Sequence, residues 1–163
     1  MDDLNGILRY AANFELVKCK VLVEFNLGEG FPVLDDASER DYHIAFHTLY
    51  SEIRDLRPRP EKARITSKLE NEVQKVQIEH NGNRAPEDKL ELLNQKLAKC
   101  ARGEVHYGKF SRHGNLIAAT ILQKYGGRIR LENIGGEYCV RTTVEIQIPK
   151  SRAVRFSPIL AGL

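Results

Sequence analysis

Two histidines, His43 and His47, are spaced so that a helix would place two metal-ligating groups together. Side chains four residues apart share one face of a helix, and imidazole nitrogen is a common ligand of zinc. No glutamate follows His43 in the HExxH pattern of zinc proteases, and the flanking sequence offers no obvious third ligand. We therefore expect a surface role for this pair rather than metal binding.

The remaining reactive side chains form no recognisable catalytic pattern. Cys19, Cys100 and Cys139 are widely spaced and include no CxxC pair. Their spacing argues against a zinc knuckle or a redox motif and favours structural thiols. No Ser-His-Asp or Cys-His arrangement can be argued from the spacing.

Three cations, Arg102, Lys109 and Arg112, gather in a segment without hydrophobic periodicity. Because this segment also contains two glycines, we expect a mobile loop over residues 102–113. Its cations would either neutralise a bound triphosphate or simply be solvated.

Length and composition favour one globular domain. The chain has 163 residues, of which 42% are hydrophobic and 29% are charged. No apolar run reaches the roughly 18 residues that a membrane span needs, and the acidic start at Asp2 and Asp3 does not suit a signal peptide. We therefore predict a cytoplasmic protein. The net charge of +3 is too small to argue for nucleic acid by itself.

The hydrophobic spacing alternates between helical and strand periods. It predicts helices over about 4–16, 39–56, 86–101 and 114–125, and strands over about 20–26, 62–69, 73–80, 128–133 and 138–148. Asp35 and its neighbours supply N-caps for the second helix, and two closely spaced prolines end it. We expect an α+β fold, a two-layer sandwich whose mixed, mostly antiparallel sheet has helices on one face.

Several segments carry a family resemblance. The stretch Tyr125-Gly126-Gly127-Arg128-Ile129, followed by Thr142-Thr143-Val144 and a strand that ends in proline, resembles the C-terminal half of the ATP-binding domain of histidine kinases. Lys20 to Phe25 and Gly30 to Asp35 are similar to that family's first strand and its approach to the first motif helix. The chain therefore resembles the GHKL (Bergerat-fold) ATPases, with a domain over residues 1–149 and a tail over 150–163.

This resemblance implies a pocket for ATP and magnesium, but the pocket motifs depart from the family pattern. Glu52 falls where the family has a magnesium-binding asparagine, and Asp55 falls where it has a lysine. A carboxylate can ligate magnesium, so Glu52 is the candidate metal ligand, whereas Asp55 would face phosphate with the wrong sign. The alternative is that Glu52 is a helix-surface carboxylate paired with a nearby arginine.

Two further motifs of the family's nucleotide pocket also differ from the family pattern. His80 replaces the aspartate that reads the adenine amino group, which removes a charge-assisted hydrogen bond, although Gly82 remains. The alternative for His80 is a partly exposed histidine that serves a turn. A further family motif is a pair of glycines whose amides bind phosphate at a helix start. One glycine of that pair, Gly114, is retained here, so Gly114 and the nearby Arg112 are candidate nucleotide-binding residues.

The resemblance and the altered motifs lead to three functional hypotheses. The first is a degenerate kinase-like domain, a pseudokinase that signals by binding a phosphotransfer hairpin or a response regulator. The second is an active ATP- and magnesium-binding kinase domain, since phosphoryl transfer depends mainly on positioning. The third is a nucleic-acid-binding module that uses the basic loop and the arginines of the tail. The first two require Glu52, His80 and Gly114 to meet around one cleft.

Overall fold

The computed structural model describes residues 2–108 and 111–148, and it contains every predicted helix and strand. The elements are α1 (Leu4–Glu15), β1 (Leu22–Leu27), α2 (Asp36–Arg54), β2 (Lys62–Glu70), β3 (Val73–His80), α3 (Glu87–Ala101), α4 (Gly114–Leu122), β4 (Arg128–Asn133) and β5 (Val140–Gln147), with short 3-10 turns at Val17–Cys19 and Gln123–Tyr125. Their ends differ from prediction by a few residues. Lys109 and the tail lie outside the described residues.

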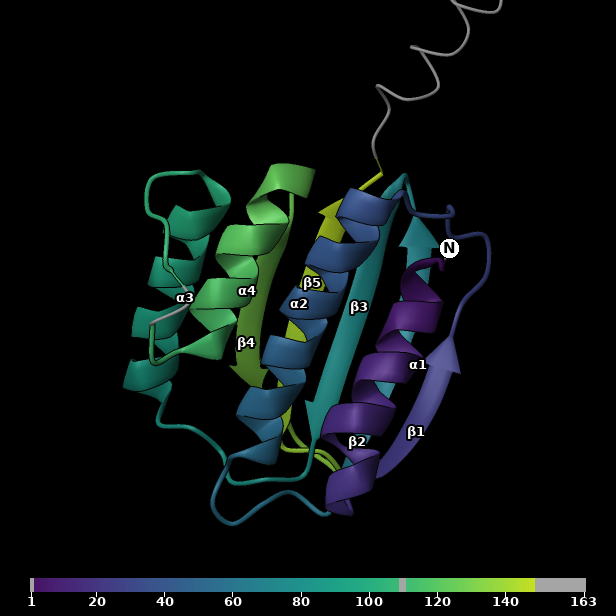
Figure 1. The fold of residues 1–163 in the computed structure, drawn as a ribbon. Helices are drawn as coiled ribbons and strands as arrows, with labels where there is room; N and C mark the ends of the chain where they lie inside the picture. The colour runs from purple at the N-terminus through teal and green to yellow at the C-terminus, as the bar shows by residue number, and fades with distance from the viewer. Residues whose placement is uncertain (1, 109–110, 149–163) are drawn as a thin grey trace, which may run out of the picture.

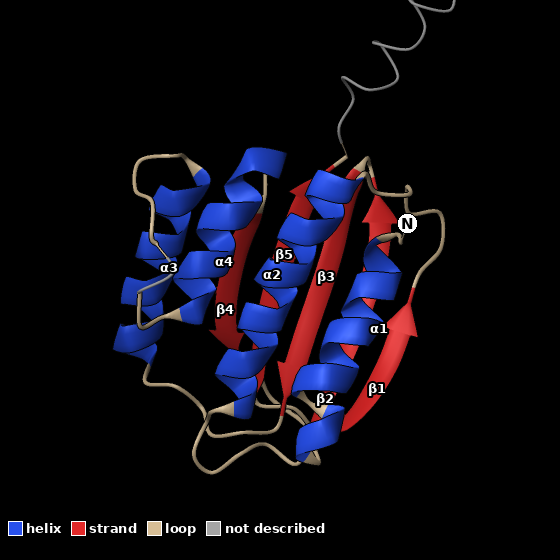
Figure 2. Cartoon of the chain, in the orientation of Figure 1, coloured by secondary structure: helices blue, strands red, loops and turns tan. Residues whose placement is uncertain are grey.

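The five strands form one mixed sheet in the order β1-β2-β3-β5-β4. β1 runs parallel to β2, and every other neighbouring pair is antiparallel. The four α-helices lie together on one face of this sheet (Figures 1 and 2). The predicted two-layer α+β sandwich is therefore confirmed.

Alternation along the strands separates the two faces of the sheet. In β3, Val76 and Ile78 are fully buried in the core, whereas the intervening Lys75 and Gln77 are only partly buried. Glu79 lies on the same face of the sheet as Lys75 and Gln77. It is nevertheless buried, because Arg64 and Arg141 pair with its carboxylate at 2.9 and 3.0 Å. One face thus packs on the helices while the other is polar, as antiparallel sheets commonly arrange.

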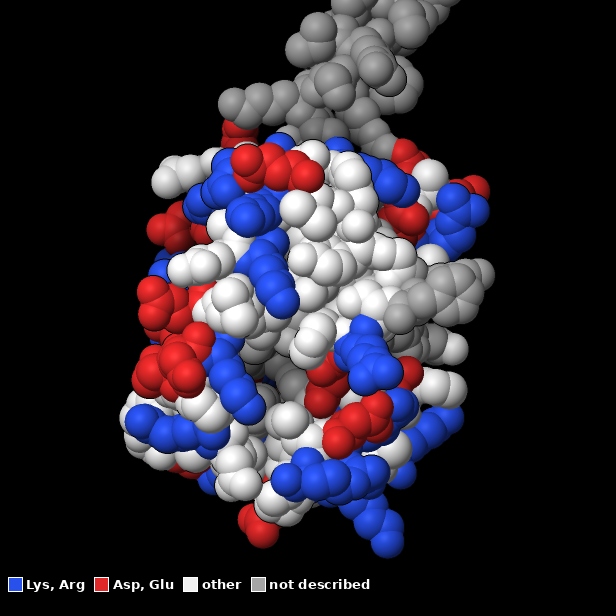
Figure 3. Space-filling view, turned by 90° about the vertical axis from the view of Figure 1, so that its left-hand side faces the viewer, with Lys and Arg blue, Asp and Glu red and all other residues white. Residues whose placement is uncertain are grey.

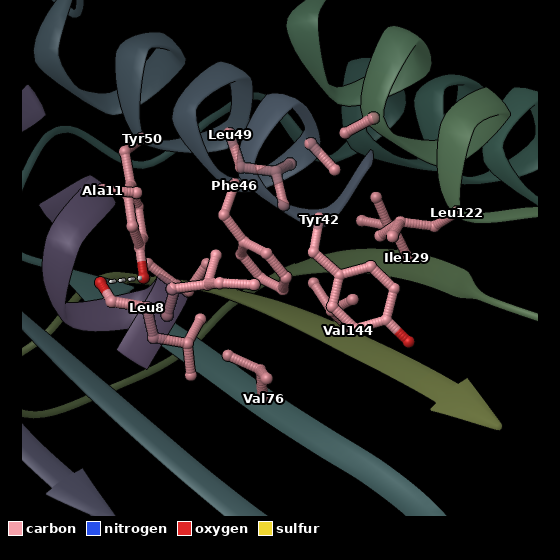
Figure 4. Close-up of a cluster of buried hydrophobic side chains, with 14 of the residues drawn as sticks. Leu8, Ala11, Tyr42, Phe46, Leu49, Tyr50, Val76, Leu122, Ile129 and Val144 are labelled. Atoms are coloured by element: carbon pink, nitrogen blue, oxygen red, sulfur yellow. Dashed lines mark hydrogen bonds between the residues drawn. The ribbon is translucent and has the colours of Figure 1, made fainter. Parts of the chain in front are cut away.

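The core centres on α2. Tyr42, Phe46 and Leu49 extend from this helix toward the sheet, where they meet side chains such as Val76 and Val144 (Figure 4). Leu8 and Ala11 of α1 border the same cluster, and the Tyr50 hydroxyl donates a hydrogen bond to the Leu8 carbonyl at 3.3 Å. A continuous apolar layer therefore joins α1, α2 and the central strands.

The Tyr125-Gly126-Gly127 motif has a local explanation. Gly126 adopts a left-handed conformation with φ of 65°, which ends the helical segment. A Cβ at Gly127 would lie 2.7 Å from both the Cβ and the carbonyl oxygen of Leu122, so no side chain fits there. The Tyr125 hydroxyl donates to the Asp41 carboxylate of α2, which ties the end of α4 to α2.

Two other sequence expectations concern the helices and the thiols. Among the helices within residues 2–108 and 111–148, none combines the length and the apolar character required to cross a bilayer. All three cysteines are free thiols, and Cys100 is buried in the core.

The central role of α2 yields a stability prediction. Phe46→Ala should lower the free energy of unfolding by about 3–5 kcal/mol, because it leaves a cavity in the layer between helix and sheet. Phe14→Ala is the matched control, since the Phe14 side chain is 51% exposed, and it should cost less than about 1 kcal/mol. Urea unfolding of both variants measures the difference. Equal losses would contradict the placement of Phe46 in the core.

Candidate functional site

The structure brings Glu52, His80 and Gly114 together at one end of the helix layer. A cavity of about 110 Å³ lies there, and it is lined by Glu52 of α2, His80 at the end of β3 and Asn115, the residue after Gly114 in α4. Leu90 of α3 and Leu131 of β4 also line it. Small-molecule pockets usually measure roughly 300–1,000 Å³, so this cavity is small for a nucleotide.

Glu52 contacts Gly114 directly. The Gly114 backbone amide donates a hydrogen bond to Glu52 Oε1. A Cβ at Gly114 would lie 2.6 Å from Glu52 Cγ and 2.9 Å from Thr48 Cγ2, so only glycine allows this approach of α4 to α2. The predicted alternative for Glu52, a surface pair with arginine, is therefore wrong.

This contact caps the N-terminus of α4. His113 is the N-cap residue of the helix but forms no side-chain cap, so the Glu52 carboxylate accepts from the first amide in its place. A helix N-terminus presents free amides and a partial positive charge, which favour an anion. At α4, the anion at that position is a side chain of the protein itself.

His80 is buried, not partly exposed as the turn hypothesis expected. Only 4% of the residue is exposed, and its Nδ1 accepts a hydrogen bond from the Gly82 amide at 3.0 Å. The proton of the neutral ring is therefore assigned to Nε2. Burial lowers the pKa of His80 to about 4, because the charged imidazolium would lose its hydration. His80 does serve the turn, as a neutral acceptor.

The other candidate residues lie away from the cavity lining. Asp55 pairs with Arg54 at 3.0 Å, and its side chain is 61% exposed. The hydrogen bond from Arg54 is the main cause that lowers the pKa of the Asp55 carboxyl. Arg112 is exposed, and Arg102 pairs with Glu104 on the surface. The structure thus gathers three of the six candidates, with Gly82 bound to His80.

Sequence reasoning missed the apolar part of the lining. Besides Leu90 and Leu131, the lining includes Leu56 beyond the end of α2 and Val140 at the start of β5. The sequence predicted the helix that carries Leu90, but not which neighbours this side chain would meet. Among the residues that line the cavity, Glu52 is the one carboxylate, while Asn83 and Asn115 offer amide oxygens, the other kind of side-chain ligand that hard cations accept.

The burial of His80 predicts a pH-dependent stability. The unfolded chain binds a proton at His80 below about pH 6.5, whereas the folded chain does so only below about pH 4. The unfolded state therefore holds more protons in this window, and the free energy of unfolding should fall by about 3 kcal/mol as pH decreases through it. Urea unfolding at about pH 7 and about pH 4.5 measures this loss.

His80→Asn is the matched variant for this prediction, because its amide oxygen can still accept from Gly82 but does not titrate. The wild-type protein should lose more stability than the variant between the two pH values, while all other groups contribute equally. If the two proteins show the same pH dependence, His80 is not the buried neutral group described here.

The comparisons with known proteins concern the fold. No protein-family profile matches this chain, and no curated protein sequence matches it. The nucleotide-free catalytic domain of histidine kinase ThkA superposes with a TM-score of 0.66 at 19% identity, over 90% of this chain and 92% of that one. The mycobacterial sensor histidine kinase MprB gives 0.62 at 10% identity, over 90% and 95%.

The histidine kinase AdeS of Acinetobacter baumannii gives a TM-score of 0.62 at 17% identity, over 91% of this chain and 66% of that one. At such identities the likeness is one of architecture rather than of chemistry. It covers about nine tenths of this chain and agrees with the resemblance found in the sequence. This chain therefore has the GHKL fold of the catalytic domains of histidine kinases.

Proposed function

We propose that this chain is a histidine-kinase-like signalling domain that works by binding another protein and does not hold Mg-ATP. One observation carries the proposal: the Glu52 carboxylate occupies the N-terminus of α4, at the edge of a cavity of only about 110 Å³. Cytoplasmic location stays a prediction from the sequence.

The phosphate end of the pocket supports this proposal through charge. A phosphate bound at the α4 N-terminus would need the amide that Glu52 now accepts from, and two anions repel at this distance. Moving Glu52 aside would leave that amide uncapped until a ligand arrived. Glu52 therefore stabilises the ligand-free arrangement.

The adenine end of the pocket also supports the proposal, because His80 presents a hydrogen-bond donor where adenine recognition needs an acceptor. In the family that the chain resembles, an aspartate accepts from the adenine amino group. His80 already uses Nδ1 to accept from Gly82, and its remaining ring nitrogen carries the proton. A donor at this position cannot pair with an amino group, so adenine would lose its main point of recognition.

An active ATP- and magnesium-binding domain is the second candidate, and the carboxylate chemistry of Glu52 is the observation in its favour. Glu52 lines the same cavity as His80, and its carboxylate could bind magnesium after leaving Gly114. The cavity would then have to widen by separation of Leu56 and Leu90. Transfer of radiolabelled phosphate from ATP to a hairpin that carries an acceptor histidine would establish this function.

A nucleic-acid-binding role ranks last because the charges are mixed. On the side formed by α3 and β4, acidic and basic side chains alternate without a continuous basic patch (Figure 3). The polar face of the sheet shows the same balance, since Glu79 lies between Arg64 and Arg141. Duplex binding normally needs a clustered positive surface.

The outer surface of α1 is the side we assign to a protein partner. Tyr10, Phe14 and Val17 are 61%, 51% and 45% exposed, and Ile44 of α2 is 46% exposed. Aromatic side chains exposed together are more typical of a contact surface than of a free one. We propose a helical phosphotransfer hairpin or a response regulator as the partner.

The first test is a calorimetric titration with magnesium and a non-hydrolysable ATP analogue. We expect no binding, because the phosphate and adenine positions are taken by Glu52 and by the His80 proton. Tight binding to the wild-type protein would overturn the proposal.

Glu52→Ala supplies the structural control for that titration. It should lower the free energy of unfolding by about 1–2 kcal/mol, because α4 loses its cap. Glu91→Ala, at an exposed position of α3, should change it by less than about 0.5 kcal/mol. If Glu52 instead held magnesium, its loss would abolish nucleotide binding that the wild-type protein had shown.

The partner surface has its own test. Replacement of both Tyr10 and Phe14 by Ser should weaken binding to a phosphotransfer hairpin or a receiver domain by at least about tenfold, through loss of two aromatic anchors. Leu92→Ser is the control, since Leu92 is 54% exposed on α3, and it should leave affinity unchanged. Calorimetry measures both. Equal effects would show that the α1 surface is not the contact.

A further inference from the structure

Three metal-ligating side chains meet near the start of α2, away from the cavity. Ligand atoms of Asp2, Glu39 and His43 all lie within 4.8 Å of one another. Glu39 and His43 are one helical turn apart in α2, whereas Asp2 comes from the segment before α1. The cluster thus joins His43 to Glu39 of its own helix and to Asp2 from far along the chain, and does not include His47, with which the sequence had paired it.

The backbone holds Asp2 at this position. The Asp2 carbonyl accepts a hydrogen bond from the Leu34 amide at 3.0 Å, and the Asp2 amide donates to Glu39 Oε2 at 3.2 Å. These two bonds fasten the segment before α1 to the loop that leads into α2. Asp2 thus has a defined place although its side chain is exposed.

A glycine makes room for the Asp2 carboxylate. A Cβ at Gly6, in the first turn of α1, would lie 2.9 Å from both Cγ and Oδ1 of Asp2. Alanine would suit that helical position better, but its methyl group would require the Asp2 carboxylate to shift. The His43 ring is supported in turn by the edge-on ring of Tyr10, with 5.5 Å between centroids.

The charges at this cluster are not balanced by side chains. Among residues 2–108 and 111–148, no lysine or arginine forms an ion pair with Asp2 or Glu39. Carboxylates near the N-termini of α1 and α2 also complement the helix dipoles. That role explains the two acids, but it does not explain a histidine nitrogen directed to the same point.

We propose that Asp2, Glu39 and His43 form a binding site for a divalent transition-metal cation of the Zn²⁺ type. One imidazole nitrogen and two carboxylate oxygens suit zinc, whereas calcium and magnesium prefer oxygen ligands alone. Three protein ligands leave a coordination position for water. The site joins the segment before α1 to α2, so a bound cation stabilises that junction.

The test is a titration of the whole chain with Zn²⁺, without nucleotide, followed by Co²⁺ absorption spectroscopy. The wild-type protein should bind one Zn²⁺, and His43→Ala should weaken binding by at least about tenfold. Gly6→Ala should weaken it too, by displacing the Asp2 carboxylate while favouring the helix. His106→Ala, a histidine exposed in another part of the chain, should leave affinity unchanged.

Two outcomes would overturn the proposal. Absence of Zn²⁺ binding is one, and undiminished binding by His43→Ala is the other, since the cation would then be held elsewhere, for example by thiols. Because the titration uses no nucleotide and no partner, its result does not depend on the proposed signalling function.

Discussion

The packing of α2 across the centre of the sheet is the contact on which the rest of the molecule depends. Its apolar stripe, with Tyr42, Phe46 and Leu49, is completely or almost completely buried. α1 and α4 both pack against α2, so this helix fixes the positions of both neighbours (Figure 1). Burial of large side chains is the main favourable term in folding, and the three bulkiest fully buried side chains, Tyr42, Tyr50 and Phe46, all lie on this helix.

The same packing decides the chemistry at the end of the helix layer. Once α2 and α4 are in contact, their approach near Thr48 is so close that only a glycine fits at position 114. Glu52 then lies at the first free amide of α4 and caps it. A carboxylate satisfies an orphan helix amide as well as a bound phosphate does, which permits the fold to persist without a ligand.

His80, which lines the same cavity as Glu52, also binds a backbone amide of the protein. A charged aspartate at a buried strand end would need a charged or donor partner to offset its lost hydration. A neutral imidazole carries no charge to offset, and its Nδ1 accepts the hydrogen bond that the Gly82 amide of the turn donates. Glu52 and His80 thus each satisfy a backbone amide of the protein. Both groups therefore bind the protein's own backbone within a fold shared with histidine-kinase catalytic domains.

The sequence by itself determined the order of the helices and strands and the two-layer arrangement. Those features follow from local periodicity and turn chemistry, such as the alternation in β3 and the left-handed Gly126 that ends the helical segment. The meeting of Glu52, His80 and Gly114 was predicted through the family resemblance, because the order of elements fixes where helix and strand ends converge.

Only the tertiary structure decided what those residues contact. Glu52 bonds an amide 62 residues away, and His80 shares its cavity with residues of α2, α3, α4, β4 and β5, so neither environment is encoded in adjacent residues. The proximity of Asp2 to His43 likewise results from packing between segments that are distant in the sequence. Helical spacing predicts neighbours within one element, but contacts between elements depend on packing distances and rotamers that local patterns do not specify.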